Sequence, residues 1–597
     1  MPGRYLILHQ PAAAAPHPAF ERARHIVGLA ATIDHPGLML LCRAREPVLI
    51  LPRDRGGVVG DVFRSGGEGA CVRFAPSDIE MGALLGSGGS TLRDRAWGSY
   101  LSVVRHGADR LLVMRDPSGG IPCYVVRDGA LTICSDDLRW VPHLLRRTPG
   151  IDRAAVRETL LFRDLRGRST CLSGVEELVP GELTDVAGRR LQPLDRWHPL
   201  QHAHAGPTDM AAASELLQRR ILSTVATLAS GHSRPLVTVS GGLDSSVVAA
   251  GLVASGCRPV GLTLVHPGPE GDERLYTNAL AAGLAMEIVE AETDADWIDP
   301  ERSLAAWLPR PAARGFSQAR ERAAIEGVGA RGCDSVFTGN GGDTLLGYST
   351  SVLPVVDRYR ASRSWRGTWR TIDDVAALHG ETVWHVARRA WRARVGRTSS
   401  YPSDPSFLVG SAEMLAAISP PDHPWLDGLD RLPPAKAAQI RSLVGQHHHG
   451  EAMPVADLVP VFSPLIAQPV VEACLAVPTW LNVAGGRNRA VARHAFRHLL
   501  PATLIDRAGK GGPDGLCQQI YARHRTRLAA LLLDGRLRAW GIVDGAAIEV
   551  ALGDRTCFVD GRLVRLLQLA DVEAWIRMRE TEAAPTLMPV PSATAAA

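Results

Sequence analysis

The sequence predicts an α/β plus α+β protein: a β-rich first part, then a doubly wound parallel sheet with a helix-rich end. Three observations favour this class. The chain has 597 residues, which is too long for one hydrophobic core. Over about the first 200 residues, short apolar runs alternate with turn residues. Beyond Asp209, apolar strand segments alternate with helical ones, which is typical of a parallel sheet covered on both faces.

The elements are expected in the following order. Runs such as GLMLLCRA, YLSVVRHG and RLLVMRD predict the strands of the first part. Residues 209–231 predict a long amphipathic helix. The segments PLVTVS, RPVGLTLVH, MEIVEAE and DSVFTG predict four strands that alternate with helices, and about 350–580 is helix-rich.

We therefore expect two domains and a tail. The Pro-, Gly- and His-rich stretch 197–209 marks the boundary between domains at 1–205 and 206–580. The last stretch, 581–597, is small and rich in Pro and Ala, so we expect it to be disordered.

Composition argues against several classes of protein. A net charge of +4 is too small for a surface that coats nucleic acid. The 10 cysteines include no CxxC pair, which argues against a zinc ribbon or a disulfide framework and favours reduced thiols. The N-terminus is a poor signal peptide, and no run reaches about 18 apolar residues. We expect a cytoplasmic protein with neither a membrane nor a nucleic-acid partner.

The stretch TVSGGLDSSVVAAGLVASG, 238–256, predicts an anion site between a strand and a helix. Gly241 and Gly242 allow close backbone approach, and the helix is expected to begin near Ser245 with its free N–H groups facing the loop. Asp244 supplies a carboxylate for a divalent metal. The spacing and the missing lysine exclude a GxxxxGK[ST] loop. The residues expected to bind phosphate are Ser240, Gly241, Gly242, Leu243, Asp244, Ser245 and Ser246.

SGGLDSS resembles the pyrophosphate loop of ATP pyrophosphatases, in the form found in the asparagine synthetase branch. WGSYLSVV and RDPSGGIPCYV resemble its glutaminase-type N-terminal domain, and FTGNGGDTLLGYS resembles its second nucleotide-site motif. SPLIAQPVVEACLAVP, VARHAFRHLLP and RAGKGGPDG follow in the family's order. The resemblance implies a glutaminase-like β-rich sandwich, then an ATP-pyrophosphatase synthetase domain that uses ATP and Mg²⁺ to convert a carboxylate into an acyl-adenylate and then an amide.

The site residues follow from the motifs and the resemblance. Asp244 and Asp343 each follow a strand predicted for the same sheet, and strand ends of an open sheet converge on one crevice, so we expect both to bind Mg²⁺. By resemblance, Lys510 contacts reacting phosphate and acyl oxygens, and it is one of only two lysines in the chain. The catalytic set is thus Lys510, Asp343 and Asp244. The second motif and the segment before Lys510 add nucleotide contacts from Gly339, Asn340, Gly341 and Arg507.

Two departures from the family bear on the substrate. Glutamine-hydrolysing members need a cysteine directly after the initiator methionine, but this chain has Pro2 and no cysteine before Cys42, so we expect no glutaminase activity and no ammonia tunnel. Asparagine synthetases carry acids where this chain has Asn340 and Thr344. An amide is a poor general base, so plain asparagine synthesis is disfavoured.

The sequence is most similar to the lasso peptide macrolactam synthetases. These adenylate an Asp or Glu side chain of a precursor peptide, whose own N-terminal amine then closes the ring. The implied partners are the leader-cleaved core peptide, a leader protease and a leader-recognition protein. The alternatives are a β-lactam-type synthetase, although these are associated with a tyrosine in place of Asn340, an ammonia-dependent asparagine synthetase, and an inactive scaffold of a peptide-maturation complex.

A histidine triplet at His447, His448 and His449 is a weak signal for a metal site. Adjacent residues do not share a helix face, so a packed or solvated cluster is expected instead.

Overall fold

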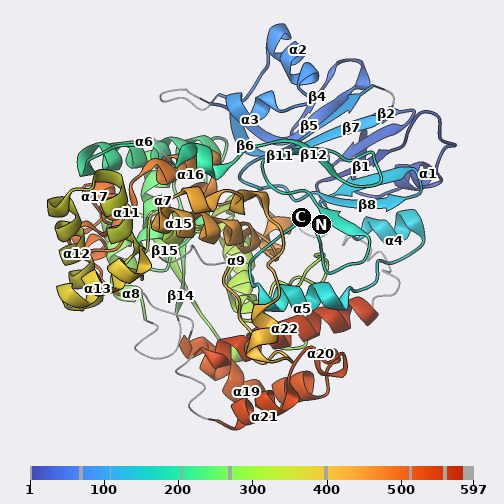
Figure 1. The fold of residues 1–597 in the computed structure, drawn as a ribbon. Coiled ribbons are helices and arrows are strands. Elements are labelled where there is room, and N and C mark those ends of the chain that lie inside the picture. The colour runs from blue at the N-terminus through green and yellow to red at the C-terminus, as the bar shows by residue number, and fades with distance from the viewer. Residues whose placement is uncertain are drawn as a thin grey trace.

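The computed structural model describes residues 3–65, 72–107, 109–203, 206–265, 272–394, 401–509, 514–554 and 561–581 (Figure 1). It has antiparallel sheets in its first part, a parallel sheet in the second and a helix-rich C-terminal part. The predicted mixed α/β class is therefore confirmed. Within the described ranges, no helix is both long enough and apolar enough to cross a membrane. Of the predicted tail, only Thr581 is described, and it ends the last helix.

Two six-stranded antiparallel sheets form the first part of the chain. In spatial order, the first sheet contains β10 (Val175–Glu177), β8 (Tyr124–Asp128), β9 (Leu131–Ser135), β1 (Tyr5–His9), β3 (Leu38–Cys42) and β2 (Ala30–His35). The second contains β12 (Gln192–Arg196), β11 (Glu182–Asp185), β7 (Arg110–Arg115), β6 (Ala96–His106), β5 (Gly56–Arg64) and β4 (Val48–Ile50).

Strand β1 shows why the two sheets form a sandwich. Successive side chains of a strand point to opposite faces. Tyr5 and Ile7 lie in a core that also holds Leu101 of the second sheet, whereas Leu6 and Leu8 lie in a separate core shared with the helices α1 (Ala19–Arg24) and α4 (Trp140–Leu145). Both faces of β1 are thus buried, which explains its continuous apolar sequence.

The second part is built on a five-stranded sheet in which all neighbours are parallel. Its spatial order is β15 (Glu287–Glu292), β14 (Val260–Val265), β13 (Pro235–Thr238), β16 (Ser335–Phe337) and β17 (Val461–Phe462). The first four are the strands predicted from sequence. The fifth, β17, has two residues and comes from more than a hundred residues further along the chain, so no local pattern indicated it.

Helices cover both faces of this sheet, as the doubly wound prediction requires. Leu236 and Val336 lie in a core with Ala323 and Val328 of α9 (Gln318–Arg331). Their neighbours on the strands, such as Val237, lie in the other core with α6 (Met210–Ala229) and α7 (Leu243–Ala254).

The remaining helices give the second part its helix-rich character. In chain order these are α8 (Arg274–Leu284), α10 (Gly342–Leu345), α11 (Leu353–Ser362), α12 (Trp365–His379), α13 (Val383–Ala393), α14 (Ala412–Ala416), α15 (Pro434–Val444), α16 (Gln468–Ala476), α17 (Ala490–Phe496), α18 (Ala502–Ile505), α19 (Asp514–Leu533), α20 (Arg536–Ala539), α21 (Gly545–Gly553) and α22 (Arg562–Thr581). The first part adds α2 (Asp78–Gly86), α3 (Thr91–Arg95) and α5 (Arg153–Leu161). A 3₁₀ segment, η11 (Thr479–Gly486), precedes α17.

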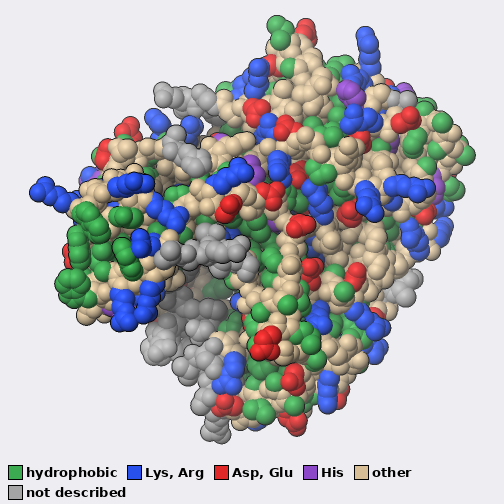
Figure 2. Space-filling view, in the orientation of Figure 1, with side chains coloured by type: hydrophobic (Ala, Val, Ile, Leu, Met, Phe, Trp, Pro, Cys, Tyr) green, Lys and Arg blue, Asp and Glu red, His purple; other side chains and the backbone are tan. Residues whose placement is uncertain are grey.

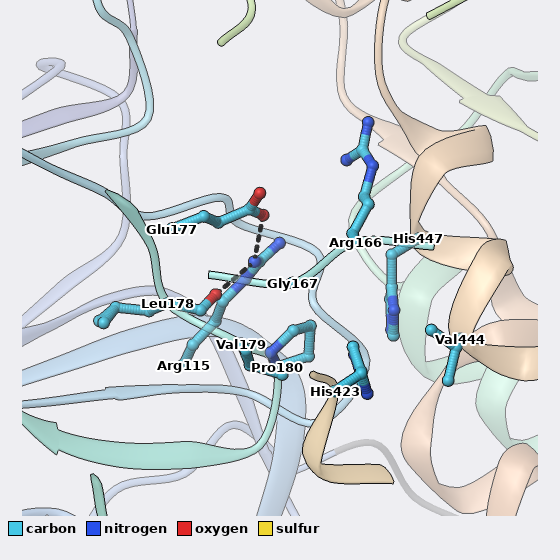
Figure 3. Close-up of a pocket in the computed structure, with 10 residues that line it drawn as sticks. All are labelled: Arg115, Arg166, Gly167, Glu177, Leu178, Val179, Pro180, His423, Val444 and His447. Atoms are coloured by element: carbon cyan, nitrogen blue, oxygen red, sulfur yellow. Dashed lines mark hydrogen bonds and ion pairs between the residues drawn. The ribbon is translucent and has the colours of Figure 1, made fainter. Parts of the chain in front are cut away.

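A buried carboxylate joins the two parts of the molecule. Glu177 Oε1 of β10 accepts a hydrogen bond from Arg115 Nη1 at 2.8 Å (Figure 3). Its Oε2 pairs with Arg310 of the second part. Burial alone would raise the pKa of Glu177, but Arg310 and Arg115 lower it well below its usual range. Beside this group, Arg166 pairs with Glu451, again across the two parts. The small pocket in Figure 3 lies among these charged groups, His423 and His447.

We predict that Glu177→Gln destabilises the protein strongly. The change leaves two buried guanidinium groups without their counter-charge, which costs about 3–5 kcal/mol in free energy of unfolding. Because its folded-state pKa is lowered, Glu177 contributes this stability above about pH 4, and the contribution disappears as the pH falls through that lowered value. Urea titration at pH 7 measures the effect.

Asp427→Asn is the matched control. Asp427 pairs with Arg196 across the same two parts, but both side chains are exposed, by 62% and 44%. Asp427→Asn should lower the free energy of unfolding by less than about 1 kcal/mol. Equal losses in the two variants would contradict the role assigned to Glu177.

Candidate active site

The strand order places the two sequence motifs side by side. The chain runs outward from β13 through β14 to β15, then returns to the opposite side of β13 to form β16. Strands β13 and β16 are neighbours, with Val237 opposite Phe337. The order of the sheet therefore reverses between them, and this is where open α/β sheets hold their ligands, outside the carboxyl ends of the strands. Both predicted motifs follow directly from these two ends.

The first loop has the backbone geometry expected of an anion site. Gly241 has φ +59°, and a Cβ there would lie 2.7 Å from Tyr276 Cβ, so glycine is required. Helix α7 begins at Leu243, two residues earlier than predicted. Its N-cap is Gly242, which has no side chain to form a capping hydrogen bond. The backbone N–H groups at the start of α7 thus border the loop. The hydroxyls of Ser245 and Ser246 both donate to the Gly242 carbonyl, at 3.3 and 2.8 Å.

The second loop packs directly against the first. A Cβ on Gly339 would lie 2.7 Å from the backbone nitrogen of Ser245, and one on Gly342 would lie 2.3 Å from Asp244 Cγ. Neither position can hold a side chain without moving the first loop. Gly341 has φ +87° and is the N-cap of α10, whose first turn carries Asp343. The glycines of the second motif therefore bring the two predicted carboxylates together.

Asp244 and Asp343 share one cationic atom, Arg489 Nη1. This atom lies 3.0 and 3.1 Å from the two carboxylate oxygens of Asp244 and 3.0 Å from Asp343 Oδ1. The side chains of Arg489 and Asp244 are 5% and 13% exposed, whereas Asp343 is 45% exposed. The guanidinium also stands over the ring of Tyr348, 5.2 Å from its centroid. The site therefore has a closed side formed by Arg489 and an open side at Asp343.

Arg489 was not predicted from the sequence. It lies just before α17 with φ +58°, a left-handed conformation uncommon for arginine. The segment VARHAFRHLLP was recognised, but Arg489 precedes it, and a chain with 66 basic residues offers no local signal for choosing one arginine. The position depends on a contact that spans 245 residues of sequence.

Arg507 borders the first loop from the other side. Its Nη1 donates to the Ser240 carbonyl at 3.4 Å, and its Nη2 to Glu273 Oε1 at 2.6 Å. The guanidinium lies 4.0 Å from the ring centroid of Tyr276. Arg493 holds this segment by donating to the carbonyls of Ile505 and Arg507. Lys510 lies outside the described residues, so its predicted role stays a prediction.

Asn340 and Thr344 are both held by the segment that contains the histidine triplet. Asn340 Nδ2 donates to the His449 carbonyl at 3.3 Å, and Gln446 Nε2 donates to Thr344 Oγ1 at 3.1 Å. His448 bonds to Arg166 and to the Ala312 carbonyl. Burial lowers the pKa of both His447 and His449 to about 3.

The triplet is thus a packed, neutral cluster, one of the two arrangements expected for it. In the described part of the chain, no group of three or more His, Cys, Asp or Glu side chains is arranged to hold a metal ion.

The fold and the site define a doubly wound α/β protein whose paired loops hold two carboxylates beside a helix N-terminus. A family model described as asparagine synthase matches residues 217–577, which is more than half of the chain. The chain belongs to the asparagine synthase family. It is an ATP-dependent, amide-forming carbon–nitrogen ligase, as predicted.

The other comparisons add little. No curated protein matches the chain. Matching solved structures include the allosteric regulatory enzyme of purine biosynthesis, at 10% identity and TM-score 0.19, over 49% of this chain and 74% of that one. Glutamine phosphoribosylpyrophosphate amidotransferase from B. subtilis matches at 11% identity and TM-score 0.18, over 43% of this chain and 59% of that one. Likenesses at these scores support no inference about fold or activity.

We predict that Arg489→Asn strengthens binding of a divalent cation in the absence of nucleotide. Removing the guanidinium takes away the cationic group that both carboxylates share and favours a replacement cation. One charge at this separation is worth about 1–4 kcal/mol, so affinity for Mn²⁺ should rise at least about fivefold. Asparagine suits the left-handed backbone at this position. Titration of Mn²⁺ monitored by electron paramagnetic resonance measures the affinity.

Arg487→Asn serves as the control. Arg487 lies two residues away and pairs with Asp506 on the surface, where both side chains are more than half exposed. Its loss should leave Mn²⁺ affinity unchanged. Unchanged or weaker Mn²⁺ binding by Arg489→Asn would show that the guanidinium does not occupy the cation position.

Proposed function

We propose that this ligase is a lasso peptide macrolactam synthetase. It adenylates an Asp or Glu side chain of a precursor peptide and joins it to the peptide's own N-terminal amine. The observation that carries the activation step is the pairing of Asp244 with Asp343 at the N-terminus of α7. The choice of an internal amine rests on the sequence departures at Pro2, Asn340 and Thr344.

The residues of the site suit a magnesium nucleotide. Arg489 Nε is buried and has no hydrogen-bond partner among the described residues. Asp244 and Asp343 would hold Mg²⁺, since carboxylates are the ligands it prefers and both already reach one cationic atom. Bound there, Mg²⁺ supplies charge neutralisation for the departing pyrophosphate.

The protein's own groups complete the activation step. The substrate carboxylate attacks the α-phosphorus of ATP, the bond to pyrophosphate breaks, and an acyl-adenylate forms. We assign the phosphate contacts to the α7 amides, to Ser240, Ser245 and Ser246, and to Arg507. The second loop, through Gly339, Asn340 and Gly341, is assigned to the nucleotide, and Lys510 to the reacting oxygens.

The second step joins the amine to the activated carbon. The N-terminal amine attacks the acyl carbon, AMP leaves with the bonding electrons, and the amine loses its proton to a base. Asn340 supplies no such base, because a neutral carboxamide is too weakly basic to take the proton. Its Nδ2 donates to the His449 carbonyl. A core peptide held in a folded state before closure would lower the entropic barrier to ring formation.

The β-sandwich is proposed to act as a scaffold rather than a source of ammonia. Burial raises the pKa of the Cys42 thiol to about 12 and that of Cys171 to about 11, so neither is an activated nucleophile. Pro2 lies outside the described residues. We further propose that a leader protease and a leader-recognition protein act with this enzyme in the cytoplasm.

The products separate the proposal from its alternatives. Purified full-length protein is incubated with ATP, Mg²⁺ and candidate core peptides that carry an acid several residues into the chain. A macrolactam synthetase yields AMP, pyrophosphate and a peptide lighter by one water. Release of asparagine from aspartate and ammonia would indicate a synthetase of free amino acids, and closure of a four-membered lactam would indicate the β-lactam type. No AMP with any substrate would indicate a scaffold.

We predict that Asp244→Ala abolishes adenylation. Loss of one of the two proposed metal ligands removes several kcal/mol of charge stabilisation, so AMP formation should fall at least about a hundredfold. Chromatographic quantification of AMP checks this. Asp506→Ala, at an exposed carboxylate near the same crevice, should keep activity. Normal AMP formation by Asp244→Ala would overturn the metal-binding role.

We predict that Lys510→Ala retains ATP binding but loses product. The ammonium group of lysine is a compact charge that can reach a single oxygen. The guanidinium of Lys510→Arg is planar and larger, so this variant should not restore turnover. Equilibrium dialysis with ATP and mass spectrometry of the peptide separate binding from chemistry. Turnover near the wild-type rate in Lys510→Ala would remove this residue from the catalytic set.

A further inference from the structure

An aromatic surface lies on α12 and α13, away from the carboxylate pair. Of the chain's 13 tryptophans, four are exposed, and all four lie on these two helices. They are Trp365, Trp369, Trp384 and Trp391, with 61%, 41%, 72% and 56% of their surface exposed. Figure 2 shows this region at the left edge of the molecule as a hydrophobic patch bordered by basic side chains. We call these four side chains the tryptophan face.

The tryptophans are not part of the core that anchors the two helices. Ile372 and Val375 of α12 and Val386 of α13 lie in a separate core with residues of α11. The tryptophans lie outside this core, spaced by four residues on α12 and by seven on α13, so each pair follows one stripe of its helix. The rings of Trp369 and Trp384 meet edge to face, with centroids 5.7 Å apart. The two stripes therefore join into one continuous surface.

Arginines are interleaved with these rings. Residues 358–394 contain nine arginines and three acids. Two of the acids are already engaged: Glu381 pairs with Arg389, and Asp374 accepts from the Gly485 backbone. Among the described residues, no carboxylate lies within salt-bridge distance of the exposed Arg366, Arg388 or Arg392. The tryptophan face thus carries an unbalanced positive charge.

This surface is structurally connected to the active site. Helix α12 packs on η11, where Asp374 Oδ1 accepts the Gly485 N–H at 2.9 Å and a Cβ on Gly486 would lie 2.8 Å from Ala377. Arg489 follows η11 by three residues. A partner bound on the tryptophan face would be held on a helix that braces the segment carrying Arg489.

We propose that the tryptophan face binds an acidic polypeptide segment that carries aromatic or aliphatic side chains. Tryptophan and arginine are enriched among the few residues that carry most of the binding energy at protein interfaces. The unpaired guanidinium groups suit carboxylates of a partner. On α12 and α13, the exposed large hydrophobic residues are the four tryptophans, and arginines lie between them. This docking role is independent of which carboxylate the enzyme activates.

Selection from a random peptide library displayed on phage tests the proposal. The immobilised full-length protein is compared with the double variant Trp384→Ala/Trp391→Ala, whose changed side chains are exposed and so are tolerated by the fold. Peptides enriched on the wild type alone should be rich in Asp and Glu together with Trp, Phe or Leu. A synthetic copy of the most enriched peptide should lose at least tenfold affinity for the double variant and for Arg388→Glu/Arg392→Glu, measured by fluorescence anisotropy.

The controls distinguish this surface from general stickiness. Ile79→Ala/Val550→Ala removes side chains that are 85% and 70% exposed elsewhere, and it should bind the peptide as the wild type does. Absence of enrichment, enrichment of neutral or basic peptides, or equal affinity of all variants would overturn the proposal. The wild-type protein is also sedimented with phosphatidylglycerol vesicles. If it binds them and the tryptophan double variant does not, the peptide proposal is overturned in favour of a membrane surface.

Discussion

The site depends on one electrostatic constraint: two carboxylates placed together need a cation between them. In the structure, Arg489 satisfies this need, with one nitrogen about equally close to Asp244 and Asp343. Burying a carboxylate without a counter-charge costs free energy, and Arg489 supplies that counter-charge to Asp244. One guanidinium thus holds the two carboxylates together between the two loops.

The fold around the site holds Asp244 and Asp343 next to each other. The reversal of strand order puts the ends of β13 and β16 next to each other, and the glycines of the second loop let it touch the first without intervening side chains. The segment that delivers Arg489 is braced by α12, and the segment that delivers Arg507 is held by Arg493. The site is thus assembled from four separate stretches of chain, each fixed by its own packing.

The β-sandwich and the helices α12 and α13 differ in how they relate to the rest of the molecule. The sandwich is locked to the synthetase part by the buried charge group around Glu177, which favours a fixed structural relation between them. Its described cysteines, Cys42, Cys123, Cys134 and Cys171, are buried thiols. Helices α12 and α13 of the second part carry the exposed tryptophan face, where arginines lie among the rings.

The sequence by itself determined the fold class, four of the five parallel strands, both loops and the two carboxylates, because these are local patterns of apolar runs, glycines and acids. The helix start at Leu243 was misplaced by two residues, since glycine at the N-cap leaves no side-chain signal. Only the tertiary structure decided that β13 and β16 are neighbours, that a two-residue strand completes the sheet, and that Arg489 bridges the aspartates. These features depend on contacts between residues far apart in the chain. In the sequence, Arg489 looks like many other arginines, and only the packing of the folded chain places it between the two aspartates.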